Sequence, residues 1–532
     1  MSSFRVEHID HSVSGLIAPL VMEHIKGNKE VGELSHYPLS KEGMDSAMAD
    51  RGTFQHRTVL VKALKAQNAK IELSEKSRSN IDALLSSNSF CITTGHQLCL
   101  LTGPLYFIHK ILSTIKFTRQ MSARHGQKTF VPIFWMASED HDLEEVDHFN
   151  FNSKRVDWYT EQEGAVGRMQ LENIGTTLNS FFNDLGNGEH GTMIREAITD
   201  AYRPDRDLAS ATRHFVNALF GEFGLVIIDG DDVELKRSFA PLMAQEINDR
   251  ETKGLVEDTV SRKNWRYKIQ VNPRSVNLFY LSNGARDRIK YIEEDRFSAA
   301  GKSWAKEELL QELNEHPDRF SPNVILRPVY QELVLPNLAY VGGAGELAYW
   351  LELKSTFEQF NMKMPVLALR DHVLWIKKKP ARKLERSGLQ LIDLFRDAGI
   401  LINEKVIEEK GDEITLVKEA AELQDLFENI SKKATRIDPN LERSAAGEEK
   451  RAQKSMERLQ KKMIRAAKRQ NKDQFQRIRD ILAVVSPNGS FQERHDNLLD
   501  IYLEFGPELF VDLLNACDPL QNQLTVLIEN DQ

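Results

Sequence analysis

Two short stretches of the sequence concentrate side chains that could bind or activate a small molecule. TTGHQLCLLTGP (93–104) combines glycine with small polar residues, and FWMASEDHDLEEVDH (134–148) is rich in acids; each begins where an apolar run ends. Carboxylate and imidazole groups can act as general bases, orient an amine, or hold Mg²⁺ or Zn²⁺. The second stretch therefore supplies the catalytic candidates Glu139, Asp140, His141 and Asp142. A solvated, highly charged loop is the alternative interpretation.

The first stretch has the features of a phosphate-binding loop. Backbone N–H groups at a helix start favour anions, and glycine allows a ligand to come close to the backbone. Thr93-Thr94-Gly95-His96 also fits the (His/Thr)-x-Gly-His pattern of class I nucleotidyltransferases, in which the final His contacts ATP phosphates; a plain turn is the alternative. No convincing Lys-Met-Ser-Lys-Ser loop and no P-loop accompany the pattern. The binding candidates here are Thr94, Gly95, His96, Gln97, Thr102 and Gly103.

Two later apolar stretches also end in residues that could bind a ligand. LRPVYQELVLPNLAYVGGAGE (326–346) closes on glycines that permit either close approach to a ligand or a tight strand-to-helix turn. An arginine guanidinium suits a carboxylate or a phosphate through its bidentate fork. The further binding candidates are Arg327, Gln331, Glu332, Gly342, Gly343, Glu346 and, after another apolar run, Arg370.

The elements that must position these residues alternate between strands and helices. Apolar runs at 89–94, 129–137, 223–229, 323–329, 338–341 and 364–370 are typical of strands, and helical patterns span 103–120 and 345–360. Such alternation predicts an α/β fold with a mostly parallel, Rossmann-like sheet. Because ligands bind beyond the carboxyl ends of parallel strands, the two polar loops should face one cleft.

The second half of the chain changes character after about residue 375. Leu416, Ala420, Leu423, Phe427 and Ile430 are spaced 4, 3, 4 and 3, and a second seam continues to about Leu482. We expect an α/β core at 1–375 with inserted lobes at about 150–215 and 245–310. An α-helical antiparallel coiled-coil arm follows at 376–485, and a C-terminal helical segment at 486–532 packs back on the core. An arm of this length favours a homodimer.

Composition excludes several classes of protein. The 532 residues carry 70 Lys and Arg against 79 Asp and Glu, a formal net charge of −9, which gives no reason to expect nucleic acid as a partner. No uncharged apolar run approaches a membrane span, and no secretory signal is recognisable. The three cysteines lack metal-ligand spacing and are too few for a disulfide framework. The sequence therefore predicts a cytoplasmic protein without a tightly bound metal.

The ordered set of motifs resembles one enzyme family. TTGHQLCLLTGPLYFIHK, PIFWMASEDHDLEEVDH, RPVYQELVLPNLAYVGGAGELAYW and SPNGSFQER are similar to the cysteine ligase family of bacillithiol biosynthesis, and the similarity spans most of the chain. The resemblance implies a Rossmann-like core similar to nucleotidyltransferases and a coiled-coil domain that mediates dimerisation. It also implies a ligase that joins the carboxyl group of cysteine to the amine of glucosaminyl malate.

Amide formation requires an activated carboxyl group, and the fold resemblance suggests ATP with Mg²⁺ as the activating agent. In this interpretation the loops at 93–103 and 342–345 cradle phosphates, an acid or His from 139–148 deprotonates the amine, and Arg327 or Arg370 holds the malate carboxylates. Three alternatives stay open: an ATP-dependent ligase for another amino acid or sugar, a metal-dependent hydrolase built on 139–148, and a non-catalytic scaffold that acts through its arm.

Overall fold

The structure is a computed structural model that describes residues 4–51, 54–262, 265–282 and 284–530. Its internal contacts divide the chain into two compact units. The first unit runs to Trp375 and resumes over Gln492–Leu527, while the second comprises Ile376–Phe491 and the residues from Ile528 onward. Among the described residues, no helix is long and apolar enough to cross a membrane.

A five-stranded parallel sheet forms the centre of the first unit. Its order is β14 (Val366–Leu369), β13 (Asn337–Gly342), β2 (Ser89–His96), β3 (Thr129–Met136) and β6 (Val226–Asp229). The register pairs Thr93 with Ile133 and Gly95 with Trp135, so β2 and β3 end side by side. The predicted parallel α/β sheet is thus confirmed, and five of the six predicted strands belong to it.

Both faces of this sheet are buried, which explains why its strands are apolar without alternation. Cys91 and Ile133 belong to the apolar cluster on one face, whereas Ile92 and Phe134 belong to clusters on the other. Helix α7 (Tyr106–Arg124) follows β2 and buries Phe107 and most of its apolar side chains. It begins at Tyr106, later than the predicted start at Gly103. The single helix predicted for 345–360 is two short helices, α16 (Ala344–Trp350) and α17 (Lys354–Gln359).

The strand predicted at 323–329 is wrong. Residues Leu326–Val334 form helix α15 instead, directly after the short strand β12 (Phe320–Pro322). The Asn323 side chain accepts hydrogen bonds from the backbone N–H groups of Ile325 and Leu326, at 2.9 and 3.2 Å, which is typical of a helix start. Pro328 lies in the first turn, where the missing N–H is tolerated. The apolar run is therefore the buried face of a helix.

Two insertions extend the carboxyl-end side of the sheet. The first contains α8 (Leu143–Val146), β4 (His148–Phe151), β5 (Lys154–Asp157), α9 (Ile174–Asp184), α10 (Glu189–Ala201) and α11 (Leu208–Phe220). The second contains α12 (Val233–Asp249), α13 (Thr252–Val260), β7 (Leu278–Ser282), β8 (Ala285–Arg288), β9 (Lys290–Tyr291), β10 (Arg296–Ala299), β11 (Lys302–Ala305) and α14 (Lys306–Glu315). Its strands form two small sheets, β12-β7-β8 and β11-β10-β9.

The chain ends complete the first unit. Strand β1 (Phe4–Asp10) precedes α1 (His11–Ser14), α2 (Pro19–Ile25), α3 (Lys29–Gly32), α4 (Lys41–Arg51), α5 (Arg57–Gln67) and α6 (Glu75–Ala83). The C-terminal segment contains α23 (Leu499–Phe505), α24 (Glu508–Ala516) and β16 (Gln523–Glu529). Strand β16 lies between β1 and β15 (His372–Ile376). The C-terminal segment was expected to be helical, but it also contains this strand.

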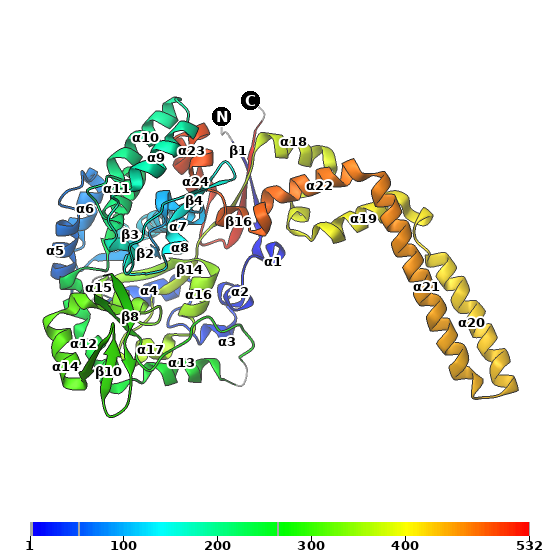
Figure 1. The fold of residues 1–532 in the computed structure, drawn as a ribbon, viewed down its shortest axis with the longest axis horizontal. Helices are drawn as coiled ribbons and strands as arrows, with labels where there is room; N and C mark the ends of the chain where they lie inside the picture. Colours follow the sequence, from blue (N-terminus) through cyan, green and yellow to red (C-terminus); the bar gives the residue numbers. More distant parts are fainter. Residues whose placement is uncertain (1–3, 52–53, 263–264, 283, 531–532) are drawn as a thin grey trace. The chain divides into compact units, whose positions relative to one another are not determined.

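The second unit is an α-helical arm. It comprises α18 (Lys378–Ser387), α19 (Ala398–Lys410), α20 (Val417–Ile437), α21 (Leu441–Gln470) and α22 (Lys472–Val485). Helices α20 and α21 pack side by side as an antiparallel coiled coil (Figure 1). The second seam, predicted to continue to about Leu482, is interrupted at Asn471, which separates α21 from α22.

Candidate functional site

A cavity of about 780 Å³ opens at the carboxyl ends of the parallel strands. Its wall includes Gly95–Gln97 at the end of β2, Glu139 and Asp140 after β3, and Gly343–Glu346 after β13. Strands β3 and β13 flank β2 on opposite sides, so the cavity lies where the strand order reverses. Open α/β sheets bind ligands at this position. The two polar loops therefore face one cavity, as the sequence indicates.

Gln97 joins the two loops directly. Its Nε2 donates to Asp140 Oδ2 at 2.9 Å and to Glu145 Oε2 at 2.6 Å. Burial raises the pKa of Asp140, but the Gln97 hydrogen bond and the charge of Arg286 outweigh burial and lower it overall. Asp140 is consequently an ionised carboxylate in the cavity wall.

His96 presents a neutral imidazole to the same cavity. Its Nδ1 lies 3.0 Å from the Gln97 carbonyl oxygen, and its ring centroid lies 5.2 Å from those of both Tyr106 and Phe107. Burial, with the nearby charge of Lys110, lowers the pKa of His96 to about 3. The ring can therefore exchange hydrogen bonds with a ligand, but it does not add positive charge at neutral pH.

Lys110 and Glu346 hold the loops after β2 and β13 together. Lys110, buried in α7, donates to the Gly95 carbonyl and lies 2.6 Å from Glu346 Oε2. Glu346 also accepts hydrogen bonds from the Gly343 N–H and the Tyr340 hydroxyl, both at 2.9 Å. Burial raises the pKa of Glu346, but Lys110 outweighs it and lowers the pKa to about 2. Glu346 is therefore ionised, and the hydrogen bond that it accepts from Gly343 orders the loop after β13.

Two of the predicted arginines lie in the wall. Arg327, on α15, donates to the Tyr349 hydroxyl. Arg370 follows β14, and its two Nη atoms contact Glu493 at 2.8 and 2.5 Å. In the described part of the chain, the buried Nε of Arg370 has no hydrogen-bond partner. This arrangement leaves one arginine donor at the cavity without a protein acceptor.

Glu493 and Arg494 come from a short turn, η8 (Gln492–Arg494), where the chain returns from the arm. Glu493 is fully buried, and its Oε2 also lies 3.1 Å from His109 Nδ1. Arg494 lines the cavity and forms no ion pair with any described carboxylate. At the start of this turn, the Gln492 side chain bonds both the N–H and the carbonyl of Trp375, at 2.8 and 3.0 Å.

Several predicted residues lie away from the cavity wall, which corrects their expected placement: Thr94, Thr102, Gly103, His141, Gln331, Glu332 and Gly342. Thr94 donates to the Val341 carbonyl at 2.7 Å, between strands. Glu332 is buried and lies 2.7 Å from Arg51. Because α15 leads into the start of β13, its last turn, which carries Gln331 and Glu332, approaches the amino end of the sheet. His141 contacts Arg286 at 3.0 Å instead of entering the cavity.

Several lining residues escaped the sequence interpretation: Tyr106, Lys110, Arg274, Arg286, Arg288, Tyr349 and Arg494. Lys110 lies between the apolar residues Ile108 and Ile111 of α7, and no pattern in the sequence separates it from the other basic residues of that helix. Arg286 and Arg288 alternate along β8, directly after the hairpin signal Ser282-Asn283-Gly284. The guanidinium of Arg286 lies 3.9 Å from the Phe279 ring centroid and donates to the Pro322 carbonyl at 3.1 Å.

Charge in the cavity is unevenly distributed. Among the described residues, seven cationic side chains and four carboxylates line it, so its field favours an anionic ligand. Three of the four carboxylates, Glu139, Asp140 and Asp142, come from the single loop after β3. No three His, Cys, Asp or Glu side chains converge as a metal site anywhere in the described ranges. The loop after β3 thus places three carboxylates side by side in the cavity wall.

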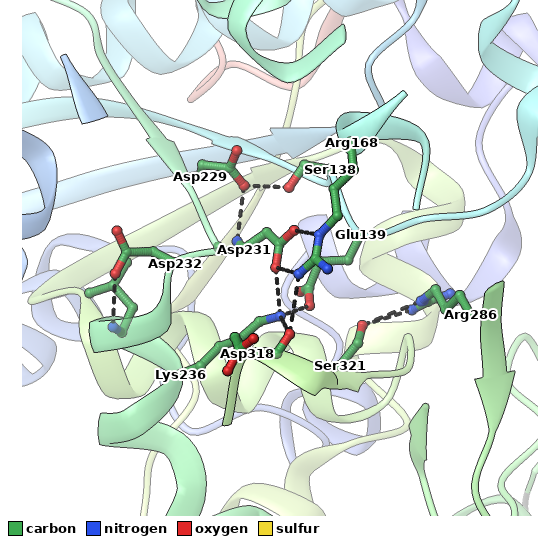
Figure 2. A network of polar contacts seen from close by, with 12 residues as sticks. Ser138, Glu139, Arg168, Asp229, Asp231, Asp232, Lys236, Arg286, Asp318 and Ser321 are labelled. Carbon is green, nitrogen blue, oxygen red and sulfur yellow. Dashed lines mark hydrogen bonds and ion pairs between the residues drawn. The ribbon is translucent and has the colours of Figure 1, made fainter. Parts of the chain in front are cut away.

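Figure 2 shows a polar network behind the acidic loop. Glu139 Oε1 lies 2.7 Å from Lys236 Nζ, which also lies 2.6 Å from Asp231 Oδ1. Asp231 accepts two hydrogen bonds from Arg168, at 2.6 and 2.7 Å. Nearby, Ser138 donates to Asp229, whose pKa burial raises to about 6. The network connects the loop after β3 to the residues that follow β6.

Comparison with known families agrees with this architecture. Residues 4–371 match the family model described as "Bacillithiol biosynthesis BshC, N-terminal Rossmann-like domain", and residues 373–529 match its "C-terminal coiled-coil domain". The chain belongs to the BshC family. This membership confirms the family resemblance of the motifs and the fold class of a Rossmann-like core with a coiled-coil domain.

Relatives of the BshC family align over nearly the whole chain. A Flavobacterium johnsoniae protein named "Putative cysteine ligase BshC" is 37% identical over 524 residues, covering 98% of this chain and 99% of the relative. A protein of the same name from Christiangramia forsetii is 37% identical and covers 98% of both chains. One from Bacillus anthracis is 29% identical and covers 93% of this chain and 94% of its own.

Proposed function

We propose that this protein is a ligase of bacillithiol biosynthesis that joins the carboxyl group of L-cysteine to the amine of glucosaminyl malate. The observation that carries the proposal is the full-length family match, together with relatives at 37% identity that are named as cysteine ligases. The bond formed is an amide, so the enzyme belongs to the carbon–nitrogen ligases.

The charge of the cavity supports these substrates. Glucosaminyl malate carries one amine and two carboxylates, and cysteine carries one of each. The loop after β3 offers carboxylates to an amine, while Lys110, Arg327, Arg370 and Arg494 offer donors to carboxylates or phosphates. In this proposal, Arg327 or Arg370 holds the malate carboxylates, and one of the acids Glu139, Asp140 and Asp142 receives the proton of the attacking amine.

A carboxylate does not condense with an amine in water without activation. We propose ATP with Mg²⁺ as the co-substrate that activates cysteine. The excess of cations around Gly95 and Gly343 fits a polyphosphate, and the glycines there leave the backbone accessible. The amine nitrogen then attacks the activated carbonyl carbon, the C–N bond forms, the bond to the phosphoryl oxygen breaks, and the amine proton passes to a carboxylate.

We further propose that the protein is a homodimer through its coiled-coil arm. Apolar side chains of the α20–α21 hairpin stay exposed in the single chain, with Leu426 54%, Ile437 82% and Leu459 52% accessible. Exposed apolar side chains on a helical hairpin favour a further helix as partner.

Mass spectrometry of the purified protein with cysteine, glucosaminyl malate and Mg²⁺, with and without ATP, tests the proposal. We expect the cysteinyl amide product only with ATP, in equal amount to AMP if the intermediate is an adenylate, or to ADP if it is an acyl phosphate. The K110M variant should lose most turnover, since it removes the cation that orders Gly95 and Glu346. Absence of product under all these conditions would contradict the proposed activity.

A further inference from the structure

Lys236 is a fully buried cation directly behind the cavity wall. Its side chain is 1% exposed, and its Nζ contacts Glu139 Oε1 at 2.7 Å, Asp231 Oδ1 at 2.6 Å and the Asp318 carbonyl at 3.3 Å (Figure 2). A buried ammonium requires compensation, because removal of a charge from water is costly. Lys236 therefore fixes the position of both carboxylates that it contacts.

The charge balance of this network requires an ionised Glu139. Lys236 and Arg168 contribute two positive charges, and Asp231 contributes one negative charge. Burial raises the pKa of Asp231, but Lys236 and Arg168 outweigh it and lower the pKa to about 2. The ionised carboxylate of Glu139 completes a neutral set.

The second oxygen of Glu139 is available to a ligand. Glu139 lines the cavity with 13% of its side chain exposed, and Oε2 has no hydrogen-bond partner among the described residues. Asp140 and Asp142 line the wall beside it. A fixed carboxylate with one free oxygen in a cluster of acids suits a small cation with several N–H donors, which is the chemistry of a primary ammonium group.

We propose that Glu139 binds the primary amine of the substrate as an ammonium ion, and that Lys236 is the positioning residue that holds Glu139 for this contact. The inference rests on the proposed function, because glucosaminyl malate supplies that amine. Asp231 and Arg168 act one step further away, by keeping Lys236 in place.

The same geometry predicts how the K236M variant behaves. The charged or titratable groups that face Glu139 are Lys236 on α12, Arg168 and Asp231 in the network, Arg286 on β8 and the phenol of Tyr330 on α15. In K236M, the Glu139 carboxylate loses its nearest cation and the contact that fixes its position. The amine of the substrate should therefore bind less tightly to K236M than to the parent protein.

Calorimetric titration of the full-length protein tests the proposal. The probes are glucosaminyl malate and its N-acetyl derivative, which lacks the cationic amine, each titrated at neutral pH. The parent should prefer the amine form by about tenfold, as expected for a charge-assisted hydrogen bond. E139Q and K236M should lose this preference, whereas K236R should retain it.

A matched control is K363M, because Lys363 pairs with Asp50 at 2.8 Å outside the cavity wall. If K236M fails to fold, E139Q still tests the contact, because Lys236 keeps its ion pair with Asp231 in the E139Q variant. A preference that survives E139Q, or a parent that binds both forms equally, would overturn the inference while leaving the ligase activity possible. A parent that binds neither form would overturn the proposed function together with the inference.

Discussion

Gln97 donates a hydrogen bond to Asp140 at 2.9 Å, so the loop that follows β2 is tied to the loop that follows β3. The same amide nitrogen reaches Glu145 at 2.6 Å. One neutral side chain thus sets the spacing between the glycine-containing loop and the acidic loop of the cavity.

The Q97A variant should disturb this spacing more than it disturbs the fold. Loss of hydrogen bonds to two carboxylates should reduce kcat/KM about tenfold or more, whereas the free energy of unfolding should fall by only about 1–2 kcal/mol. Steady-state kinetics and chemical denaturation check this. The control is Q311A, because Gln311 also donates to a carboxylate, Glu315 at 2.8 Å, but lies on α14 outside the cavity wall. Equal losses of activity in both variants would contradict the assignment.

Glu493 should prove essential for the stability of the folded protein, whereas the next residue, Arg494, should not. Removing one partner of a buried ion pair typically costs about 3–5 kcal/mol, so E493A should strongly destabilise the core by leaving Arg370 uncompensated. E493Q should recover part of this loss because it keeps hydrogen-bonding atoms near Arg370. Thermal unfolding of both variants provides the measurement, with E508A, at an exposed position at the start of α24, as the control.

Arg494 should affect substrate binding alone. It is exposed, lines the cavity and makes no ion pair with a described carboxylate. R494A should therefore unfold within about 0.5 kcal/mol of the parent. If Arg494 contacts a substrate anion, the KM for one substrate should rise roughly tenfold. Unchanged kinetics for every substrate would remove Arg494 from the binding site.

His96 should make the core less stable in acid. The folded pKa of about 3 lies below the ordinary value of 6.5, so the unfolded chain takes up the proton first as pH falls. The stabilising contribution is complete above pH 6.5 and is lost as pH falls from 6.5 towards 3. H96Q should therefore lose about 2 kcal/mol less stability than the parent between pH 7 and pH 5. Thermal unfolding at both values tests this, with H125Q as the control; parallel losses in H96Q and the parent would argue against a buried neutral ring.

The proposed dimer should depend on the exposed apolar side chains of the arm. The double variant L426E/I430E places two charges on a surface that is apolar in the parent, with Leu426 54% and Ile430 40% exposed. Light scattering after size exclusion should show a dimer for the parent and a monomer for the variant. L85E, at an exposed leucine of the first unit, is the control and should leave the mass unchanged. A monomeric parent would contradict the proposal.

The sequence was most informative where a single pattern determined a single structure. The strands at 89–94 and 129–137 are apolar on both faces and end in polar loops, so their place at the sheet centre and their shared cavity could be predicted. The run at 323–329 was ambiguous because a short buried helix and a buried strand look alike, and only the Asn323 cap distinguishes them.

The partners that hold the cavity residues in place could not be predicted, because the pairs are distant in the sequence. Lys110 pairs with Glu346, which lies 236 positions later in the sequence, and Arg370 pairs with Glu493, which lies 123 positions later. Neither separation is visible as a local pattern, and residues such as Glu332 carry the right chemistry for a site yet serve the core instead. Family resemblance identified the motifs that contain these residues, but it did not show which side chains face the ligand.

Trp375 and Gln492, which are hydrogen-bonded to each other, flank the main segment of the arm in the sequence. The main segment of the second unit, Ile376–Phe491, begins directly after Trp375 and ends directly before Gln492, and two hydrogen bonds hold these two residues together. A segment that departs and returns at one point can be lengthened, shortened or exchanged without shifting any strand of the central sheet. Insertion and deletion could therefore reshape the arm through evolution while Glu493 and Arg494, the first residues after the junction, keep their places in the core.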